Sequence, residues 1–361
     1  MPRAEPPFGA YLHVPFCSRR CDYCAFASWD DRGHLLGEYV AALATEVRRA
    51  APSLPPATTV FFGGGTPSLL TPEQLASVLV ELPLAAGAEV TVECNPDTLS
   101  EAKLAGYRAA GVNRISLGVQ SMRPHVLASL GRTHDPENVA RAVEAITSVG
   151  FRTWNADLIY GAVGESIEDW TATLQDVLAL HPPHLSAYGL TVEAGTPLAT
   201  QPDRHPDDDD QAAKYEVAEE LLTGAGLLSY EVSNWARPGH ECRHNRLYWS
   251  QGDYRGFGCA AHSHAAGRRW WNVRTPERYL SLVGDGRPVE AAGESLDDEE
   301  RVLEGLQLAL RTREGVPAWA LDAELDGLVE PAGDHLVLTL RGRLLANEVA
   351  LRLRQPSTTT S

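Results

Sequence analysis

Several features are scarce in this 361-residue chain, and each scarcity excludes a class of protein. Basic residues number 31 against 48 acidic ones, which gives a net charge of −17. That balance argues against a general nucleic-acid or anionic-membrane binder, because both need a positive surface. No apolar run approaches the 18 residues of a membrane span, and residues 1–7 are polar and proline-rich, unlike a signal peptide. We therefore expect a cytoplasmic globular protein with no integral membrane segment and with two or three domains.

Cysteine is also scarce, with six residues that are unevenly placed. So few cysteines in a long chain do not suggest a disulfide framework, so we expect reduced thiols. Cys17, Cys21 and Cys24 lie within eight residues, in the spacing Cys-x3-Cys-x2-Cys. Three thiolates on one short loop can bind three irons of a [4Fe–4S] cluster and leave the fourth iron open to a ligand. Structural zinc would need a fourth ligand at comparable spacing, and neither Asp22 nor Phe26 suits that role.

Short β-rich runs alternate with amphipathic runs through the first 230 residues. Expected strands cover residues 10–14, 58–62, 89–93, 114–119, 152–158 and 184–190. Expected helices cover residues 36–50, 100–110, 136–149 and 167–180, with another opening at 71–72. Six βα units in a row predict a parallel sheet with right-handed crossovers. Six units are too few for a closed eight-fold barrel, so a partial barrel or a doubly wound sheet is expected.

The pattern changes beyond residue 235. Residues 237–264 are rich in glycine, histidine and aromatic residues and show little periodicity. We predict two domains, residues 1–235 and a smaller α+β domain with winged-helix features over 236–361. The four aspartates at 207–210 are interpreted as a helix start, not as a cation site, because acidic residues suit a helix N-terminus. Elements expected after residue 200 are helices over 211–224, 296–313 and 318–325, a strand over 230–235, and a strand–turn–helix over 336–353.

Polar landmarks fall at the ends of successive predicted strands. Glycines at residues 63–65 follow the second strand, and glycine lets the backbone approach a ligand closely. Glu93, Gln120 and Asp157 end the third, fourth and fifth strands, and Tyr188 lies within the sixth. In parallel α/β folds, ligands bind at the C-terminal ends of the strands. Together with the cysteine loop, these residues predict one binding face, although each alone would suit ordinary capping or loop hydrogen bonding.

These motifs are similar to those of the radical S-adenosylmethionine (SAM) superfamily, and within it to the HemN/HemW family. The resemblance is carried by Tyr-Leu-His-Val-Pro-Phe-Cys at 11–17, the cysteine spacing, Phe-Gly-Gly-Gly-Thr-Pro-Ser at 62–68, the segment 111–121, Gly-Arg-Thr-His at 131–134 and Asp-Leu-Ile-Tyr-Gly at 157–161. It implies a partial (β/α)6 TIM-like barrel plus a small C-terminal α+β domain. It also implies a [4Fe–4S] cluster on Cys17, Cys21 and Cys24, with SAM on the open iron.

The same resemblance implies further site residues. Tyr11, Gly64 and Glu93 would contact the cluster-bound SAM. The positions that hold a second SAM in the family's oxidase, oxygen-independent coproporphyrinogen III oxidase, are matched here by Tyr23, Gly65, Thr66, Gln120, Arg132 and Asp157.

Two features favour the heme-chaperone branch of the family over the oxidase branch. Phe26 stands where the oxidase has a fourth motif cysteine, and the first strand begins earlier than in the oxidase. Residues 244–249 match a His-Asn-x-x-Tyr-Trp motif that is linked to heme binding in that branch. Imidazole can serve as an axial heme ligand, and aromatic rings offer flat apolar surface, so His244 is the candidate heme ligand.

The resemblance thus implies a chaperone that binds a [4Fe–4S] cluster, SAM and heme and delivers heme to acceptor proteins, respiratory ones among them. A monomer or a homodimer is expected. Two alternatives stay open: a radical SAM enzyme acting on a tetrapyrrole, as an oxidase or a methyltransferase, and a zinc-binding interaction module using the cysteines and histidines of residues 240–264. The chain departs from its relatives at 161–164, with Gly-Ala-Val-Gly for Gly-Leu-Pro-Gly, and at 257–263, where Cys259 appears.

Overall fold

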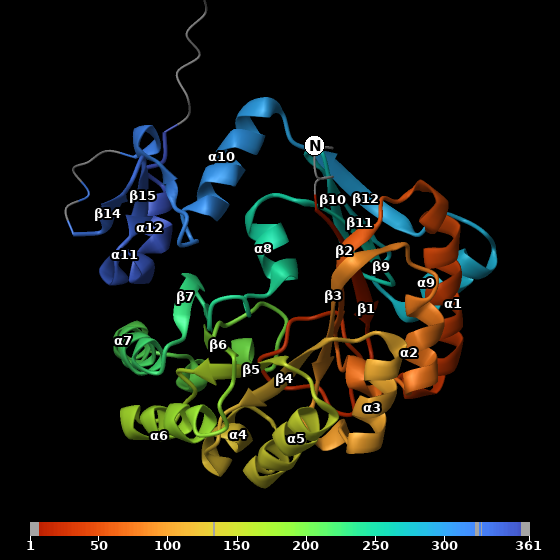
Figure 1. Ribbon diagram of the computed structural model, residues 1–361, viewed down its shortest axis with the longest axis horizontal. Helices are drawn as coiled ribbons and strands as arrows, with labels where there is room; N and C mark the ends of the chain where they lie inside the picture. The colour runs from red at the N-terminus through yellow and green to blue at the C-terminus, as the bar shows by residue number, and fades with distance from the viewer. Residues whose placement is uncertain (1–6, 133, 322–324, 326, 355–361) are drawn as a thin grey trace, which may run out of the picture.

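The computed structural model describes residues 7–132, 134–321, 325 and 327–354. Within them a 12-stranded sheet has the order β12-β11-β10-β9-β1-β2-β3-β4-β5-β6-β8-β7 (Figure 1). Its parallel centre consists of β1 (Phe8–Val14), β2 (Ala57–Gly64), β3 (Leu84–Cys94), β4 (Arg114–Gln120), β5 (Thr153–Tyr160) and β6 (His184–Gly189). The crossovers contain α1 (Leu36–Ala50), α2 (Pro72–Leu79), α3 (Glu101–Ala110), α4 (Pro124–Ser129), α5 (Pro136–Val149) and α6 (Ile167–Leu178).

The two faces of the central strands differ in polarity, because successive side chains of a strand point to opposite faces. The outward face is apolar and belongs to a core that includes buried residues of the crossover helices, as Val60, Val92 and Leu117 illustrate. The inward face carries polar and aromatic side chains, and Ser116 and Asn155 are buried there. The apolar outer layer forms the core, so the side chains that could bind a polar ligand lie on the inner face.

Helix caps explain why several helices begin where the sequence predicts. Thr71 caps α2 in a capping box with Gln74, and Ser166 caps α6 in the same way with Asp169. The helix expected over 211–224 is longer: α7 (Asp208–Gly224) begins after Asp207, whose side chain accepts the Asp210 amide. The aspartate run therefore forms the cap and the first turn of α7, which confirms the helix-start interpretation and moves the start forward.

The single strand expected over 230–235 is wrong. Two short antiparallel strands, β7 (Leu228–Glu231) and β8 (Asn234–Ala236), occupy this segment, and β8 also pairs with β6. The turn between them contains Ser233, whose amide donates to the Glu231 carboxylate at 3.0 Å. A buried side-chain acceptor that supports a tight turn carries no periodic signal, so the sequence did not reveal the hairpin.

The region after residue 237 contributes to the main sheet. After α8 (Arg243–Trp249), β9 (Asp253–Phe257) pairs in parallel with β1, and the antiparallel strands β10 (His262–Ala265), β11 (Arg268–Asn272) and β12 (Glu290–Ser295) follow. The helix α9 (Pro276–Gly284) contacts α1. The domain boundary at 235/236 stays a prediction.

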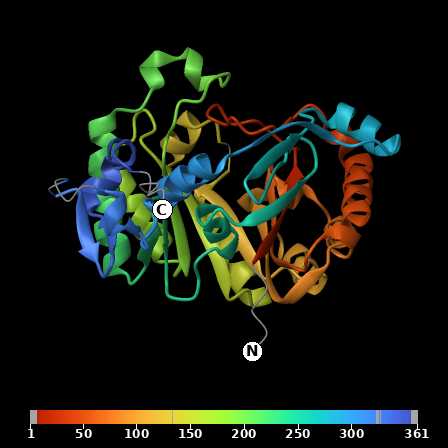
Figure 2. The ribbon, with the colours of Figure 1, turned by 90° about the horizontal axis from the view of Figure 1, so that it is seen from above.

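The last described residues form a small α+β unit with its own apolar core. It contains α10 (Asp298–Ala309), β13 (Val316–Pro317), β14 (Val329–Ala332), β15 (His335–Leu338), α11 (Leu340–Leu344) and α12 (Ala346–Ala350). Figure 2 shows it at the far side of the molecule from α1. The helix expected over 318–325 is a 3-10 turn at Ala318–Ala320, and residues 322–324 lie outside the described residues. No helix in the described part of the chain is both long and apolar enough to cross a membrane.

Candidate functional site

A cavity of about 450 Å³ opens at the C-terminal ends of the central strands. The cysteine loop covers one side of it, and the strand ends form the other walls. Of the predicted site residues, those lining the cavity are Cys17, Cys21, Tyr23, Cys24, Gly64, Gly65, Thr66, Glu93, Gln120, Arg132 and Asp157. Tyr11 and His244 are not among the lining residues. One cavity therefore gathers most of the predicted binding face.

The cysteine loop is closed at its base and carries three free thiols. The Cys17 amide donates to the Trp29 carbonyl at 3.0 Å, and the Trp29 amide donates to the Pro15 carbonyl at 2.8 Å. Cys17, Cys21 and Cys24 are half-buried. Burial raises the pKa values of the Cys17 and Cys24 thiols, so a bound cation is needed to hold them as thiolates at neutral pH.

Hydrogen-bond donors surround these sulfur atoms. The Thr66 hydroxyl lies 3.6 Å from the Cys17 Sγ, and the Arg132 guanidinium lies 3.6 Å from the Cys21 Sγ. Arg132 also donates to the Gly118 carbonyl at 2.9 Å, which orients it toward the loop. Donors to the sulfurs tune the charge and potential of an iron–sulfur cluster. Three thiols on one loop with donors beside two of them fit a [4Fe–4S] cluster.

The glycine turn after β2 packs directly against the start of the cysteine loop. Gly64 has a φ of +114°, and a Cβ there would lie 2.5 Å from the His13 imidazole. A Cβ on Gly65 would lie 2.6 Å from the Phe16 carbonyl oxygen. Real side chains do not tolerate such contacts, so this turn requires glycine at both positions.

Two carboxyl groups face the cavity, and their surroundings differ. Glu93 accepts the Gly64 amide at 3.1 Å, while burial and the nearby Asp157 raise its pKa to about 8. Asp157 accepts from the Ser116 hydroxyl at 2.8 Å and from the Asn155 amide at 2.7 Å, and burial raises its pKa as well. A cationic ligand would favour the charged forms of both groups, so this part of the cavity suits an ammonium or sulfonium group.

Gln120 marks the end of β4 with an uncommon backbone. Its φ is +65°, and the pairing of β4 with β5 shifts register between Gly118 and Gln120. A non-glycine residue in the left-handed region is strained and clusters at functional sites. Gln120 lines the cavity, so this uncommon conformation lies at the candidate site.

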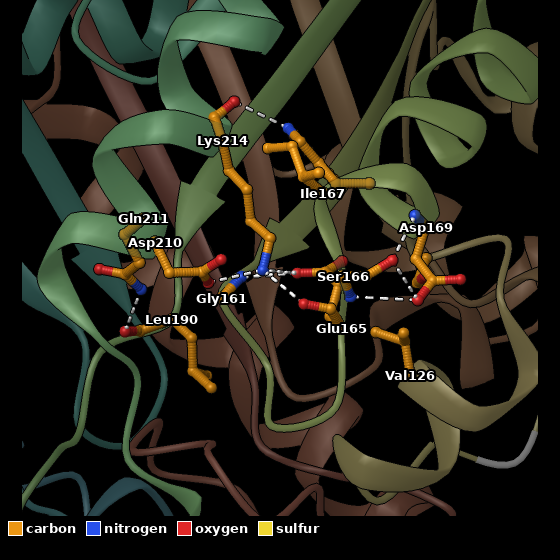
Figure 3. Close-up of polar contacts among 12 residues, drawn as sticks. Val126, Gly161, Glu165, Ser166, Ile167, Asp169, Leu190, Asp210, Gln211 and Lys214 are labelled. Carbon is orange, nitrogen blue, oxygen red and sulfur yellow. Dashed lines mark hydrogen bonds and ion pairs between the residues drawn. The ribbon is translucent and has the colours of Figure 1, made fainter.

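The wall formed by the ends of β5 and β6 rests on a buried network that the sequence did not single out (Figure 3). Lys214, one of two lysines in the chain, is fully buried and donates to the Asp210 carboxylate at 2.6 Å and the Glu165 carbonyl at 2.7 Å. Its Nζ lies 3.5 Å from the Glu165 carboxylate, which accepts the Gly161 amide at 2.7 Å. The sequence shows that lysine is scarce, but it does not show that Lys214 is buried.

Gln211 completes this support from the first turn of α7. Its Nε2 donates to the Leu190 carbonyl at 2.9 Å, and Leu190 lines the cavity. Gln211 also packs against Gly161, where a Cβ would lie 2.6 Å from its Nε2. The departure from the family pattern at 161–164 keeps this glycine, whose φ is +88°, so the turn that follows β5 is retained.

His244 lies at the opposite end of the barrel from the cavity. Its Nδ1 is 2.8 Å from the Thr59 hydroxyl, near the start of β2, and its Nε2 is 2.7 Å from the Tyr248 hydroxyl. The side chain is 1% exposed, and burial lowers its pKa to about 3. Heme ligation by His244 would require one of these hydrogen bonds to be released, and the assignment stays a prediction.

The cysteines and histidines of residues 240–264 do not converge on one point. His240 contacts Thr153 on β5, whereas Cys259 contacts Tyr39 on α1. In the described part of the chain, no group of three or more histidine, cysteine, aspartate or glutamate side chains is arranged to hold a single metal ion.

Comparison with known proteins identifies the family. Residues 11–177 match the sequence profile of the Radical SAM superfamily. The heme chaperone HemW of Mycobacterium tuberculosis (strain ATCC 25618 / H37Rv) is 42% identical over 374 residues, which cover 98% of this chain and 96% of that protein. The chain belongs to the HemW family. HemW of Escherichia coli (strain K12) is 36% identical, covering 95% and 97% of the two chains.

A solved structure confirms the expected fold of this HemW-family chain. The radical SAM coproporphyrinogen III oxidase HemN of Escherichia coli superposes with a TM-score of 0.83 at 24% identity, covering 96% of this chain and 90% of that one. The partial barrel with a small C-terminal α+β unit is therefore confirmed. A radical SAM domain holds a [4Fe–4S] cluster and SAM. The residues that hold them here are proposed below.

Proposed function

We propose that this protein is a cytoplasmic heme chaperone that binds heme and delivers it to acceptor proteins, acting as a monomer or a homodimer. The observation that carries the proposal is similarity over nearly the whole chain to proteins named heme chaperone HemW, at 42% and 36% identity. Phe26, which is 65% exposed at the cavity rim, supports it, because the family's oxidase carries a cysteine at that position.

We assign the cluster to Cys17, Cys21 and Cys24, whose donors Thr66 and Arg132 fit sulfur bound to iron. When bound and reduced, such a cluster supplies one electron to SAM. The Thr66 hydroxyl links the glycine turn to Cys17, and the Arg132 guanidinium lies beside Cys21, so both would be placed to donate to cluster-bound sulfur. The three cysteines are half-buried, so the loop shields the sulfur atoms from part of the solvent.

We assign SAM to the cavity beside the cluster. Glu93 is the acceptor for its amino group, and the Gly64 and Gly65 backbone allows the ligand a close approach. Tyr11 does not line the cavity but packs beside Gly63, next to Glu93. The remaining wall of the SAM site consists of Tyr23, Gln120 and Asp157, together with Thr66 and Arg132.

The test uses the full chain, reconstituted anaerobically with iron and sulfide. We expect iron and sulfide near four per chain, SAM binding, a Soret shift on hemin titration, and transfer of that heme to an apo-heme protein. Failure to bind hemin would refute the chaperone. Loss of coproporphyrinogen carboxyl groups with SAM and dithionite would favour the oxidase alternative, and zinc without iron would favour the interaction module.

A further inference from the structure

A column of aromatic rings runs through the barrel interior from α8 to the cysteine loop. The His244 imidazole stacks on Phe61 with ring centroids 5.3 Å apart and an interplanar angle of 25°. Phe61 stacks on Tyr11 at 6.3 Å and 20°. The Tyr11 hydroxyl lies 3.1 Å from the His13 Nδ1, and the His13 Nε2 lies 2.8 Å from the Ala27 carbonyl oxygen. The two ends of the barrel are thus joined by a continuous set of contacts.

The direction of the hydrogen bonds in the column follows from chemistry. A carbonyl oxygen only accepts, so the His13 Nε2 must donate to Ala27. Burial lowers the pKa of His13 to about 4, so the ring is neutral and its Nδ1 accepts from the Tyr11 hydroxyl. One tautomer therefore satisfies both contacts. The Tyr11 hydroxyl orients His13, and His13 fixes a carbonyl near the end of the cysteine loop.

The column leaves little room for its members to shift. A Cβ on Gly63 would lie 2.9 Å from Tyr11 and 3.1 Å from Phe61, so the two rings occupy the space of the missing side chain. A Cβ on Gly9 would lie 2.5 Å from Leu247, which brings α8 directly against β1. Because close-packed interiors deform little, a displacement at one end of such a column moves the other end.

Helix α8 is itself anchored to the barrel. The Glu89 carboxylate of β3 accepts the backbone amides of Arg243 and His244, each at 3.2 Å. His244 then bridges the Thr59 and Tyr248 hydroxyls through its two ring nitrogens. The imidazole is thus held on both edges while its face rests on Phe61.

We propose that His244 is a positioning residue for the cluster and SAM site, acting through Phe61, Tyr11 and His13 on the Ala27 carbonyl. That the cavity is the site of the cluster and SAM rests on the proposed function. The column and its effect on the loop do not, because both belong to the protein without cofactors. In the cofactor-free protein, His244 lies at the end of the barrel opposite the cavity, and both of its ring nitrogens are hydrogen-bonded within the protein.

The test compares three variants, first without cofactors. His244→Ala removes the ring, and His244→Phe restores a ring that stacks on Phe61. Ile146→Ala, which opens a cavity in the outer core on α5, controls for general loss of stability. Hydrogen exchange of peptides spanning residues 15–29 reports the Cys17 and Trp29 amides. We expect these loop peptides to exchange at least tenfold faster in His244→Ala and close to the original rate in His244→Phe. In Ile146→Ala, compared at the same thermal stability as His244→Ala, we expect the loop exchange to be unchanged.

The reconstituted proteins supply the second readout. His244→Ala should lower SAM affinity at least fivefold and alter the SAM-dependent shift in the electron paramagnetic resonance spectrum of the reduced cluster. Unchanged loop exchange in His244→Ala, or equal exchange in His244→Ala and Ile146→Ala, would overturn the proposal. Loss of the heme spectrum with unchanged SAM affinity and loop exchange would also overturn it and return His244 to the role of heme ligand. Absence of hemin binding by the unaltered protein would refute only the chaperone function.

Discussion

Replacing Lys214 by methionine tests the buried network behind the cavity wall. Methionine keeps most of the apolar stem but removes the ammonium that lies between the carboxylates of Glu165 and Asp210. The side chains of Lys214 and Glu165 are both fully buried, whereas that of Asp210 is 40% exposed and can be solvated by water. The loss therefore falls on Glu165, whose second oxygen already has no hydrogen-bond partner within the described structure.

The size of the effect follows from the burial of the pair. Removing one partner of a buried ion pair costs about 3–5 kcal/mol of unfolding free energy, because it leaves an uncompensated charge. Burial raises the pKa of Glu165, and Lys214 opposes that rise, so the variant has a still higher pKa. A carboxyl whose folded pKa exceeds its unfolded value stabilises the fold fully below the unfolded pKa and loses this contribution as pH rises through the folded pKa. The deficit should be about 3 kcal/mol at pH 8 and under about 1 kcal/mol near pH 4.5.

Urea unfolding at several pH values measures this deficit. The double variant Lys214→Met with Glu165→Gln should recover at least about 1 kcal/mol at pH 8, because neither residue is then charged. Lys214→Arg is the matched control that keeps the charge and changes the shape. A deficit that does not change with pH, or a double variant with strictly additive losses, would refute the electrostatic reasoning.

Three further predictions concern the cavity. In the cofactor-free protein, ionisation of Glu93 lowers the unfolding free energy between pH 6 and 8, because its folded pKa is about 8. Glu93→Gln should reduce this fall by at least about 1 kcal/mol, as measured by urea unfolding. A difference between the variant and the unaltered protein that does not change with pH would contradict the prediction. Gly64→Ala should weaken SAM binding at least tenfold at equal iron content, since its Cβ would meet the His13 ring, and isothermal titration checks this. Cys21→Ala should abolish iron retention on reconstitution, whereas the buried Cys94→Ala should retain it, and iron analysis decides.

Local signals explain how much of the fold was predictable. The helix α5 begins at the proline after the Asp135 cap and ends before Gly150, whose φ of +87° terminates it, so its bounds match the expectation. The six central strands have clear flanking turns; five of them fall within two residues of the expected ranges, whereas β3 begins five residues before the expected start at residue 89. In each case the deciding residues are neighbours in sequence, and no distant contact is required.

Non-local pairing explains what was not predictable. The strand β9 has five residues and pairs with β1, which lies about 240 positions earlier in the chain. No local hydrophobic periodicity indicates such a pairing. Tyr11 was expected at the SAM site, and it lies in the ring column below the cavity lining. The sequence pattern does not reveal that Phe61 and His244 stack, because these rings lie on two segments, β2 and α8, that are far apart in the chain.

The hydrogen bonds of the two cavity carboxyls, Glu93 and Asp157, indicate that the two groups have different roles. Both oxygens of Asp157 are occupied by Ser116 and Asn155, and Asn155 also lies 3.0 Å from Ser186, so Asp157 is part of a network internal to the barrel. Glu93 receives one hydrogen bond from the described residues, through the Gly64 amide, and it is one of the residues that line the cavity. Glu93 is only partly buried, so its remaining acceptor capacity is accessible to a donor group of an incoming ligand. Glu93 is therefore the carboxyl placed to bind the ligand, and Asp157 holds the wall beside it.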